Sequence, residues 1–352
     1  MLLTELIKKK LIKKEIPSFI EHNTHYLCMM GSVAYGCSED YSDMDVYGWC
    51  IPPKGYVFPH LSGYIKGFGK QPPNFECWQE HHIFDKDKKR EYDISIYGLV
   101  RYFQLVSENN PNMLDSLFVP RNCVLHSTEA SEMLRENRRL FLHKGACHKY
   151  RGYSFSQLKK CKTRETEPEL EHLLHLEKYY GLPHSNNLEE NVKVMEDIGC
   201  FMKDVDEYRL VYNDVLINKK RAIVTKLHGY DTKFMYHTVR LLSEVEEILA
   251  DHDLTLDRYD RREMMKAIRR GECSLDDVNN WVKAKEIELE KLYQSSTLRH
   301  KPDEEKIKQL LLNILESHFG NLENAISNIK ENEFLDKIKQ ICDIVEPMRK
   351  YF

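Results

Sequence analysis

The sequence predicts an α+β fold, in which a small mixed sheet with flanking helices is followed by a mainly helical part. Short segments of strand character, separated by turn residues, are concentrated before Thr128, whereas the pattern after it is nearly all helical. The chain has 352 residues, 41% of them hydrophobic, so it can bury a substantial core and form about two domains. We place the boundary near His148, which gives expected domains of residues 1–148 and 149–352.

The elements of the first domain follow from periodicity and from turn residues. Residues 1–22 carry leucine and isoleucine on one side and lysine on the other, which predicts a single amphipathic helix. The elements expected after it are a strand before Gly31, a strand through Asp43 and Asp45, a strand through Asp93, a helix over 97–107, a helix ending near Pro120, and a short strand over 123–125.

A glycine and a serine, Gly31 and Ser32, stand where the first strand turns into a short helix. Glycine lets the backbone approach a ligand closely, and serine offers a hydroxyl group and a helix N-cap. Backbone N–H groups at the start of a helix attract anions. We therefore expect phosphate oxygens to bind at this turn.

Two aspartates at alternate positions, Asp43 and Asp45, follow that turn. On a strand they project from one face, where both carboxylates can share hard cations such as Mg²⁺. Zinc would require histidine or cysteine ligands instead. Either Asp-x-Asp or Gly-Ser alone is common in turns, but their combination indicates metal-dependent nucleotidyl transfer. Ser42 is expected to orient the first aspartate.

A third carboxylate is expected at Asp93, in a segment where Tyr92 and Ile94 alternate with polar residues. Glu91 shares the polar face and remains the alternative. In a mechanism with a pair of metal ions, Asp43 and Asp45 would bridge both, and Asp93 would bind the ion that activates the attacking hydroxyl group. The adjacent His81 and His82 would face opposite ways on a regular strand, so we interpret them as structural or peripheral.

The helical part contains a second group of polar residues. Asp231 is a good N-cap for a helix reaching about Ala250, and helical spacing places Lys233, His237 and Arg240 on one stripe. Such cations suit a triphosphate, because arginine binds phosphate bidentately and lysine acts as a point charge. From spacing alone, a solvent-exposed stripe with Glu244 paired to Arg240 is favoured.

Composition excludes several classes of protein. A net charge of −4 argues against a broadly basic nucleic-acid binder. We interpret the basic and aromatic clusters at 86–90 and 144–162 as solvated faces in preference to nucleic-acid-binding surfaces. The ten cysteines include no Cys-x-x-Cys pair, which indicates reduced thiols. Without a long apolar run or a signal peptide, the chain is expected to be a soluble cytoplasmic protein with no membrane contact.

Several motifs together resemble a known family. They are the segment 31–48 (GSVAYGCSEDYSDMDVYG), Ile51-Pro52-Pro53, the Asp93 strand followed by Asn110-Pro111-Asn112, the segments 229–233 and 268–272, and His237 with Arg240-Leu241-Leu242. The chain resembles the DNA polymerase β-like nucleotidyltransferase superfamily, and more narrowly the nucleotidyltransferases associated with RNA repair in bacteria and their phages. The resemblance covers about residues 24 to 315.

The resemblance implies transfer of a nucleoside monophosphate from an NTP to an acceptor hydroxyl group. It implies two Mg²⁺ or Mn²⁺ ions at the three aspartates, nucleotide contacts from Gly31, Ser32 and Ser42, and a helical domain that closes over the site. It also favours Lys233, His237 and Arg240 as nucleotide ligands over the solvent-exposed stripe. RNA, either a tRNA or an RNA end, is the implied acceptor in a bacterial cell or phage-infected host. A protein acceptor (AMPylation) and a catalytically silent nucleotide sensor are the alternatives.

Overall fold

The computed structural model describes residues 2–38, 43–57, 74–162, 167–182 and 188–320. They form two compact units, and each is considered by itself. The first unit holds Met1–Gly145, His252–Leu256 and Leu298–Phe352, and the second holds Ala146–Asp251 and Asp257–Thr297. The chain therefore enters the second unit near the residue where we expected a domain boundary and later returns to the first. The boundary at His148 itself stays a prediction.

The first unit is built on a five-stranded sheet of order β3-β4-β2-β1-β5. Its strands are β1 (Thr24–Met29), β2 (Met44–Cys50), β3 (Cys77–Asp85), β4 (Arg90–Gly98) and β5 (Val124–Ser127). The central neighbours β2 and β4 run parallel, while the other neighbouring pairs are antiparallel. This mixed sheet, with the helices around it, confirms the α+β fold class.

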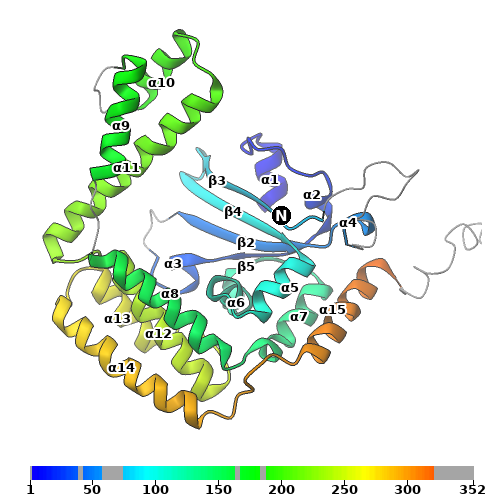
Figure 1. Ribbon diagram of the computed structural model, residues 1–352. Helices are drawn as coiled ribbons and strands as arrows, with labels where there is room; N and C mark the ends of the chain where they lie inside the picture. The colour runs from blue at the N-terminus through cyan, green and yellow to red at the C-terminus, as the bar shows by residue number, and fades with distance from the viewer. Residues whose placement is uncertain (1, 39–42, 58–73, 163–166, 183–187, 321–352) are drawn as a thin grey trace, which may run out of the picture. The chain divides into compact units, whose positions relative to one another are not determined.

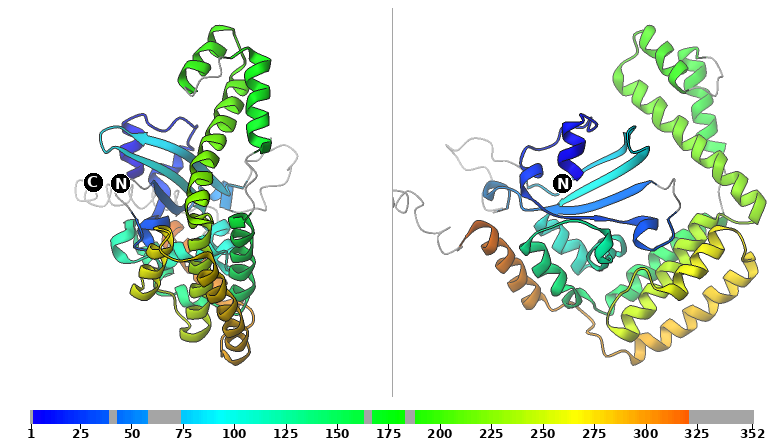
Figure 2. Two further views of the ribbon diagram at one scale, coloured as in Figure 1. Left: turned by 90° about the vertical axis from the view of Figure 1, so that its left-hand side faces the viewer. Right: turned by 180° about the vertical axis from the view of Figure 1, so that it is seen from behind.

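Helices lie on both faces of this sheet (Figures 1 and 2). The α-helices of the first unit are α1 (Leu2–Lys8), α2 (Phe19–Asn23), α3 (Gly31–Ala34), α4 (Lys54–Val57), α5 (Leu99–Ser107), α6 (Pro111–Phe118), α7 (Glu129–Glu136) and α15 (Glu304–Phe319), with 3₁₀ turns η2 (Arg121–Cys123) and η3 (Arg138–Phe141). Leu3 and Leu6 of α1 pack in one core with Val46 and Ile94 of the sheet. On the other face, Arg135 of α7 is buried and donates a hydrogen bond to the Tyr26 hydroxyl group.

The predicted N-terminal helix over residues 1–22 is wrong. Helix α1 ends at Lys8, Lys10 has a left-handed φ of 55°, and the next helix begins only at Phe19. The segment between them runs beside the edge strand β3, where the Lys13 N–H donates to the Glu80 carboxylate and the Trp78 ring N–H donates to the carbonyl of Glu15. Tertiary contacts of an irregular backbone therefore override the helical periodicity.

The other elements expected in the first unit are confirmed within about two residues. They are the strand before Gly31, the strands through Asp45 and Asp93, the helices α5 and α6, and the short strand β5. The turn predicted before α6 is present, and its Asn110 caps the helix because the Asn110 side chain accepts a hydrogen bond from the N–H of Met113. Local patterning thus determines most of this unit.

A half-buried histidine, His25, makes the stability of the first unit depend on pH. His25 stacks on Trp49, and its Nε2 lies 3.0 Å from Nδ1 of His318 in α15. Burial, and next the neighbouring His318 and His126, lower the pKa of His25 to about 4. The unfolded chain, with a histidine pKa of 6.5, then binds a proton more readily than the folded chain.

We therefore expect the free energy of unfolding to fall as the pH drops from 6.5 towards the folded pKa of about 4. Urea unfolding at several pH values above 5, where few carboxylates titrate, measures the slope. A His25→Gln variant should show a shallower slope over this range. An identical slope in the variant would show that other groups cause the pH dependence.

The second unit is helical. It contains α8 (Gly145–Lys162), α9 (Glu167–Tyr180), α10 (Leu188–Asp197), α11 (Met202–His228), α12 (Thr232–Asp251), α13 (Tyr259–Arg269) and α14 (Leu275–Ser295). Helices α9, α10 and α11 share one apolar core, while α12 packs against α13 and α14. Among the helices that the structure describes, none has the length and apolar character needed to cross a bilayer. Free thiols are present at Cys28, Cys37, Cys50, Cys77, Cys123, Cys147, Cys200 and Cys273.

Candidate active site

The turn after β1 lies directly against the second aspartate of the Asp-x-Asp pair. The Met30 N–H donates a hydrogen bond of 2.7 Å to the main-chain carbonyl of Asp45. Gly31 has a left-handed φ of +62°, and a Cβ atom placed on it would stand 2.2 Å from Oδ2 of Asp45. Only glycine fits here without displacing that carboxylate. The N-cap position of α3 is Met30, so Ser32 lies in the first turn instead of capping the helix as expected.

The parallel pairing of β2 and β4 brings Asp45 and Asp93 together. They are direct register partners, and neighbouring strands lie about 4.8 Å apart. Both side chains are half-buried, while Met44 and Tyr92 on the opposite face are buried in the core beneath α1. The alternation that buries the apolar residues therefore sets the two carboxylates side by side on the other face.

Asp43 lies just before β2 and is exposed. Its negative charge contributes to a raised pKa of His82, so it lies within electrostatic range of the same site. We call Asp43, Asp45 and Asp93 the acidic cluster. Ser42, which was expected to orient the first aspartate, lies outside the described residues.

The register favours Asp93 over Glu91 as the partner of Asp45. Glu91 lies at an earlier position of β4, and its carboxylate instead makes a short hydrogen bond with Nδ1 of His82. Asp93 also accepts a hydrogen bond of 2.7 Å from the main-chain N–H of His82, which fixes one of its carboxylate oxygens. Its role as a metal ligand stays a prediction.

The two histidines that we interpreted as peripheral both face the carboxylates of β4. The pairing of β3 with β4 is irregular between Glu80 and Ile83, and His82 has a left-handed φ of 58°. His82 contacts Glu91, while Nδ1 of His81 lies 3.6 Å from Oδ2 of Asp93. The argument from strand alternation fails because a β-bulge interrupts the strand at this point. The only signal in the sequence was the pair of adjacent histidines.

The contact with Glu91 shifts the pKa of His82, and this shift can be measured. The hydrogen bond to Glu91, followed by the charges of Asp93 and Asp43, raises the pKa of His82 above its ordinary value of 6.5. A Glu91→Gln variant keeps the shape but removes the charge, so we expect the pKa of His82 to fall, as measured by NMR titration of the ring. The signal of His172, which is paired with Glu207 elsewhere, serves as the control.

Because the pKa of His82 is raised in the folded chain, its pair with Glu91 makes the stability of the fold depend on pH. The pair with Glu91 stabilises the fold fully below pH 6.5, and this contribution is lost as the pH rises through the folded pKa. An unchanged His82 pKa in the Glu91→Gln variant would contradict this assignment of the shift.

The cations predicted to bind nucleotide lie in the second unit, on α12. Asp231 caps this helix as expected, because its side chain accepts hydrogen bonds from the N–H groups of Lys233 and Phe234. Lys233 is exposed and His237 is half-buried. Their contact with nucleotide stays a prediction.

The third predicted cation, Arg240, is 2% exposed and lies 3.0 Å from the carboxylate of Glu244, which is 0% exposed. Arg261 of α13 reaches the same buried group and also pairs with Glu247. The pairing of Arg240 with Glu244 is therefore present but buried, and it does not form the solvent-exposed stripe that spacing alone favoured. The role of Arg240 in nucleotide binding stays a prediction.

The mixed sheet, the Gly31 turn and the acidic cluster define a nucleotidyltransferase of the polymerase β type. Residues 5–326 match the family described as "RlaP: RNA repair pathway DNA polymerase beta family", and the chain belongs to this family. No curated protein matches the chain.

One solved structure is similar over most of its length. It is the crystal structure of a nucleotidyltransferase-like protein from Exiguobacterium sibiricum 255-15, with 10% sequence identity and a TM-score of 0.23, and the match covers 95% of this chain and 89% of that one.

Proposed function

We propose that this protein transfers a nucleoside monophosphate from an NTP to a hydroxyl group of RNA. The observation that carries the proposal is the direct pairing of Asp45 with Asp93 beside the bare Cα of Gly31. This arrangement occurs in a member of a polymerase β family of an RNA repair pathway. A carboxylate pair next to a turn whose backbone N–H groups can bind phosphate is what such a transfer requires.

The acidic cluster fits divalent cations of the Mg²⁺ or Mn²⁺ type. Its three members supply only oxygen ligands, and all are at least partly exposed. Asp43, Asp45 and Asp93 would hold the ions. When bound, such ions neutralise the charge of the triphosphate and lower the pKa of a bound hydroxyl group.

The residues around the acidic cluster have their own parts in the proposal. Because Gly31 has no side chain, the Asp45 carboxylate packs directly against the turn. Phosphate oxygens would then bind the backbone N–H groups of the turn and the hydroxyl group of Ser32. The main-chain N–H of His82 holds Oδ1 of Asp93, which leaves the other oxygen to orient the attacking hydroxyl group. That hydroxyl group would attack the α-phosphate in line, and pyrophosphate would leave.

Lys233 and His237 of α12 are the proposed phosphate ligands. Lys233 is accessible on α12 and His237 partly so, which suits both for contact with phosphate oxygens. Arg240 is the third predicted ligand, but its pair with Glu244 is buried, so a contact with nucleotide would require this pair to open.

The test is incubation of the protein with each of the four α-labelled NTPs, with Mg²⁺ or Mn²⁺, in a mixture of tRNA, other RNA and protein. We expect metal-dependent label in RNA. Label in protein would instead establish the protein-modifying alternative. Nucleotide binding without any label would establish a nucleotide sensor, and either result would overturn the proposal.

A further inference from the structure

A histidine and two carboxylates meet beside the acidic cluster. One ligand atom from each of His82, Glu91 and Asp93 lies within 4.8 Å of the other two. In the part of the chain that the structure describes, this is the one such group of histidine, cysteine or acidic residues. Neither His82 nor Glu91 belongs to the acidic cluster, so the group is a second donor set that shares only Asp93 with it.

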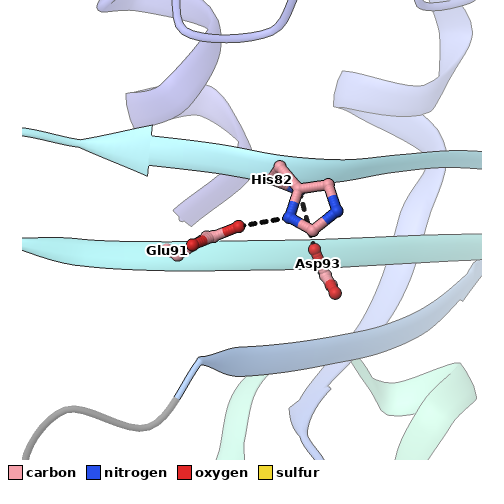
Figure 3. A group of neighbouring side chains, drawn as sticks. All are labelled: His82, Glu91 and Asp93. Carbon is pink, nitrogen blue, oxygen red and sulfur yellow. Dashed lines mark hydrogen bonds and ion pairs between the residues drawn. The ribbon is translucent and has the colours of Figure 1, made fainter. Parts of the chain in front are cut away.

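The β-bulge builds this donor set from two strands. At a regular position of β3, the side chain of His82 would follow the pleat, but its left-handed φ of 58° turns the residue towards β4. Figure 3 shows the His82 ring beside the carboxylates of Glu91 and Asp93. The His82 N–H donates a hydrogen bond of 2.7 Å to the Asp93 carboxylate. The backbone of His82 therefore positions Asp93, while its ring contacts Glu91.

The chemistry of this set differs from that of the acidic cluster. Magnesium takes oxygen ligands and dehydrates reluctantly, whereas imidazole nitrogen suits zinc and other transition metals. Catalytic zinc sites often have three protein ligands, such as histidine and carboxylate side chains, and one position open to water or substrate. One imidazole and two carboxylates are therefore a donor set for a transition metal.

The distances are close to those that zinc needs. Zinc binds nitrogen and oxygen at about 2.0 to 2.2 Å in a tetrahedral arrangement, so atoms that share one ion lie about 3.4 Å apart. The observed limit of 4.8 Å requires only a small rotation of side chains. The His82 side chain is 73% exposed and that of Glu91 is 32% exposed, so both have room to rotate.

We propose that His82, Glu91 and Asp93 form a binding site for a divalent transition-metal ion of the Zn²⁺ type. The ion takes the place of the proton shared between Nδ1 of His82 and the carboxylate of Glu91. Asp93 supplies the third ligand, and the fourth position stays open to water or substrate.

The shared Asp93 gives the site a regulatory consequence. An ion held here withdraws Asp93 from the acidic cluster, so Zn²⁺ would inhibit nucleotidyl transfer in competition with Mg²⁺. This consequence rests on the proposed function, whereas zinc binding itself does not. The decisive experiment therefore measures binding without any NTP.

The experiment is calorimetric titration of the full chain with Zn²⁺, for the wild type and for His82→Asn and Glu91→Gln variants. Asparagine tolerates the left-handed φ at position 82, so the bulge is preserved. We expect each variant to bind at least about tenfold more weakly, because it loses one ligand. Circular dichroism and thermal unfolding confirm that each variant is folded.

Two control variants separate this site from others. His172 is an exposed histidine paired with a single carboxylate, Glu207, at 3.4 Å, so His172→Ala should leave the affinity unchanged. Asp45→Asn removes a member of the acidic cluster but none of the three proposed ligands, so the zinc site should persist. Loss of the site in Asp45→Asn, or its retention in both His82→Asn and Glu91→Gln, would overturn the proposal.

A spectroscopic readout gives the same answer independently. When Co²⁺ is bound by one nitrogen and two oxygen ligands, its d–d transitions absorb visible light more strongly than those of the hydrated ion. We expect this absorption in the wild type and its loss in His82→Asn. Equal spectra in the two proteins would show that His82 is not a ligand.

Discussion

Replacing Asp45 by asparagine is expected to reduce kcat/KM for nucleotidyl transfer at least about 100-fold, with the fold preserved. Asparagine has nearly the same shape, so the contact with Gly31 and the pairing beside Asp93 remain. What disappears is one negative charge at the centre of the acidic cluster. The effect on the rate is therefore electrostatic and should greatly exceed the effect on stability.

The matched control is Asp87→Asn. Asp87 is also near the β3–β4 hairpin, but its side chain is 77% exposed and pairs with Lys9, at 2.9 Å. Exposed ion pairs of this kind contribute roughly 0 to 1 kcal/mol, so activity and stability should change little. Steady-state transfer from an α-labelled NTP to RNA compares the variants. If Asp45→Asn behaves like Asp87→Asn, Asp45 is not part of the reacting site.

Replacing Gly31 by alanine is the second change with a large expected effect. The new Cβ atom would stand 2.2 Å from Oδ2 of Asp45, so the carboxylate must move away by about 1 Å. A misplacement of this size at a reacting site costs about 100-fold in rate. The left-handed backbone adds a strain of about 1 to 2 kcal/mol that lowers stability as well.

Gly181→Ala separates the two effects. Gly181 has nearly the same φ, +64°, but a Cβ atom there meets nothing within 4 Å. Both variants carry the backbone strain, so Gly31→Ala should lose at least as much stability as Gly181→Ala in urea unfolding, while only Gly31→Ala loses transfer activity. Equal activities in the two variants would show that the close approach of Gly31 to Asp45 has no part in the function.

The sequence was sufficient to predict the strands that carry Asp45 and Asp93, because both follow a regular alternation of buried and polar residues. It did not determine their register. That pairing depends on the parallel arrangement of β2 and β4, between which the chain also forms α4 and β3. Long-range pairing is a property of the assembled sheet and leaves no local pattern.

The failures of the sequence analysis have specific physical causes. Residues 11–16 carry a helical pattern but form no helix, since the side chains of Glu80 and Trp78 hydrogen-bond to their main chain beside the edge of the sheet. The expected opposite facing of His81 and His82 is wrong because a bulge interrupts the alternation of β3. Arg240 has the spacing of a surface stripe but is buried, because α13 packs over α12 and adds Arg261 to the pair with Glu244.

The central claim is that Asp93, held next to Asp45, serves nucleotidyl transfer to RNA. The most direct test measures metal-dependent transfer of label from an α-labelled NTP to RNA by the wild type, by Asp93→Asn and by the control Asp87→Asn. We predict label in RNA with the wild type and the control, and at least about 100-fold less with Asp93→Asn. Equal labelling of RNA by Asp93→Asn and the wild type would contradict the claim.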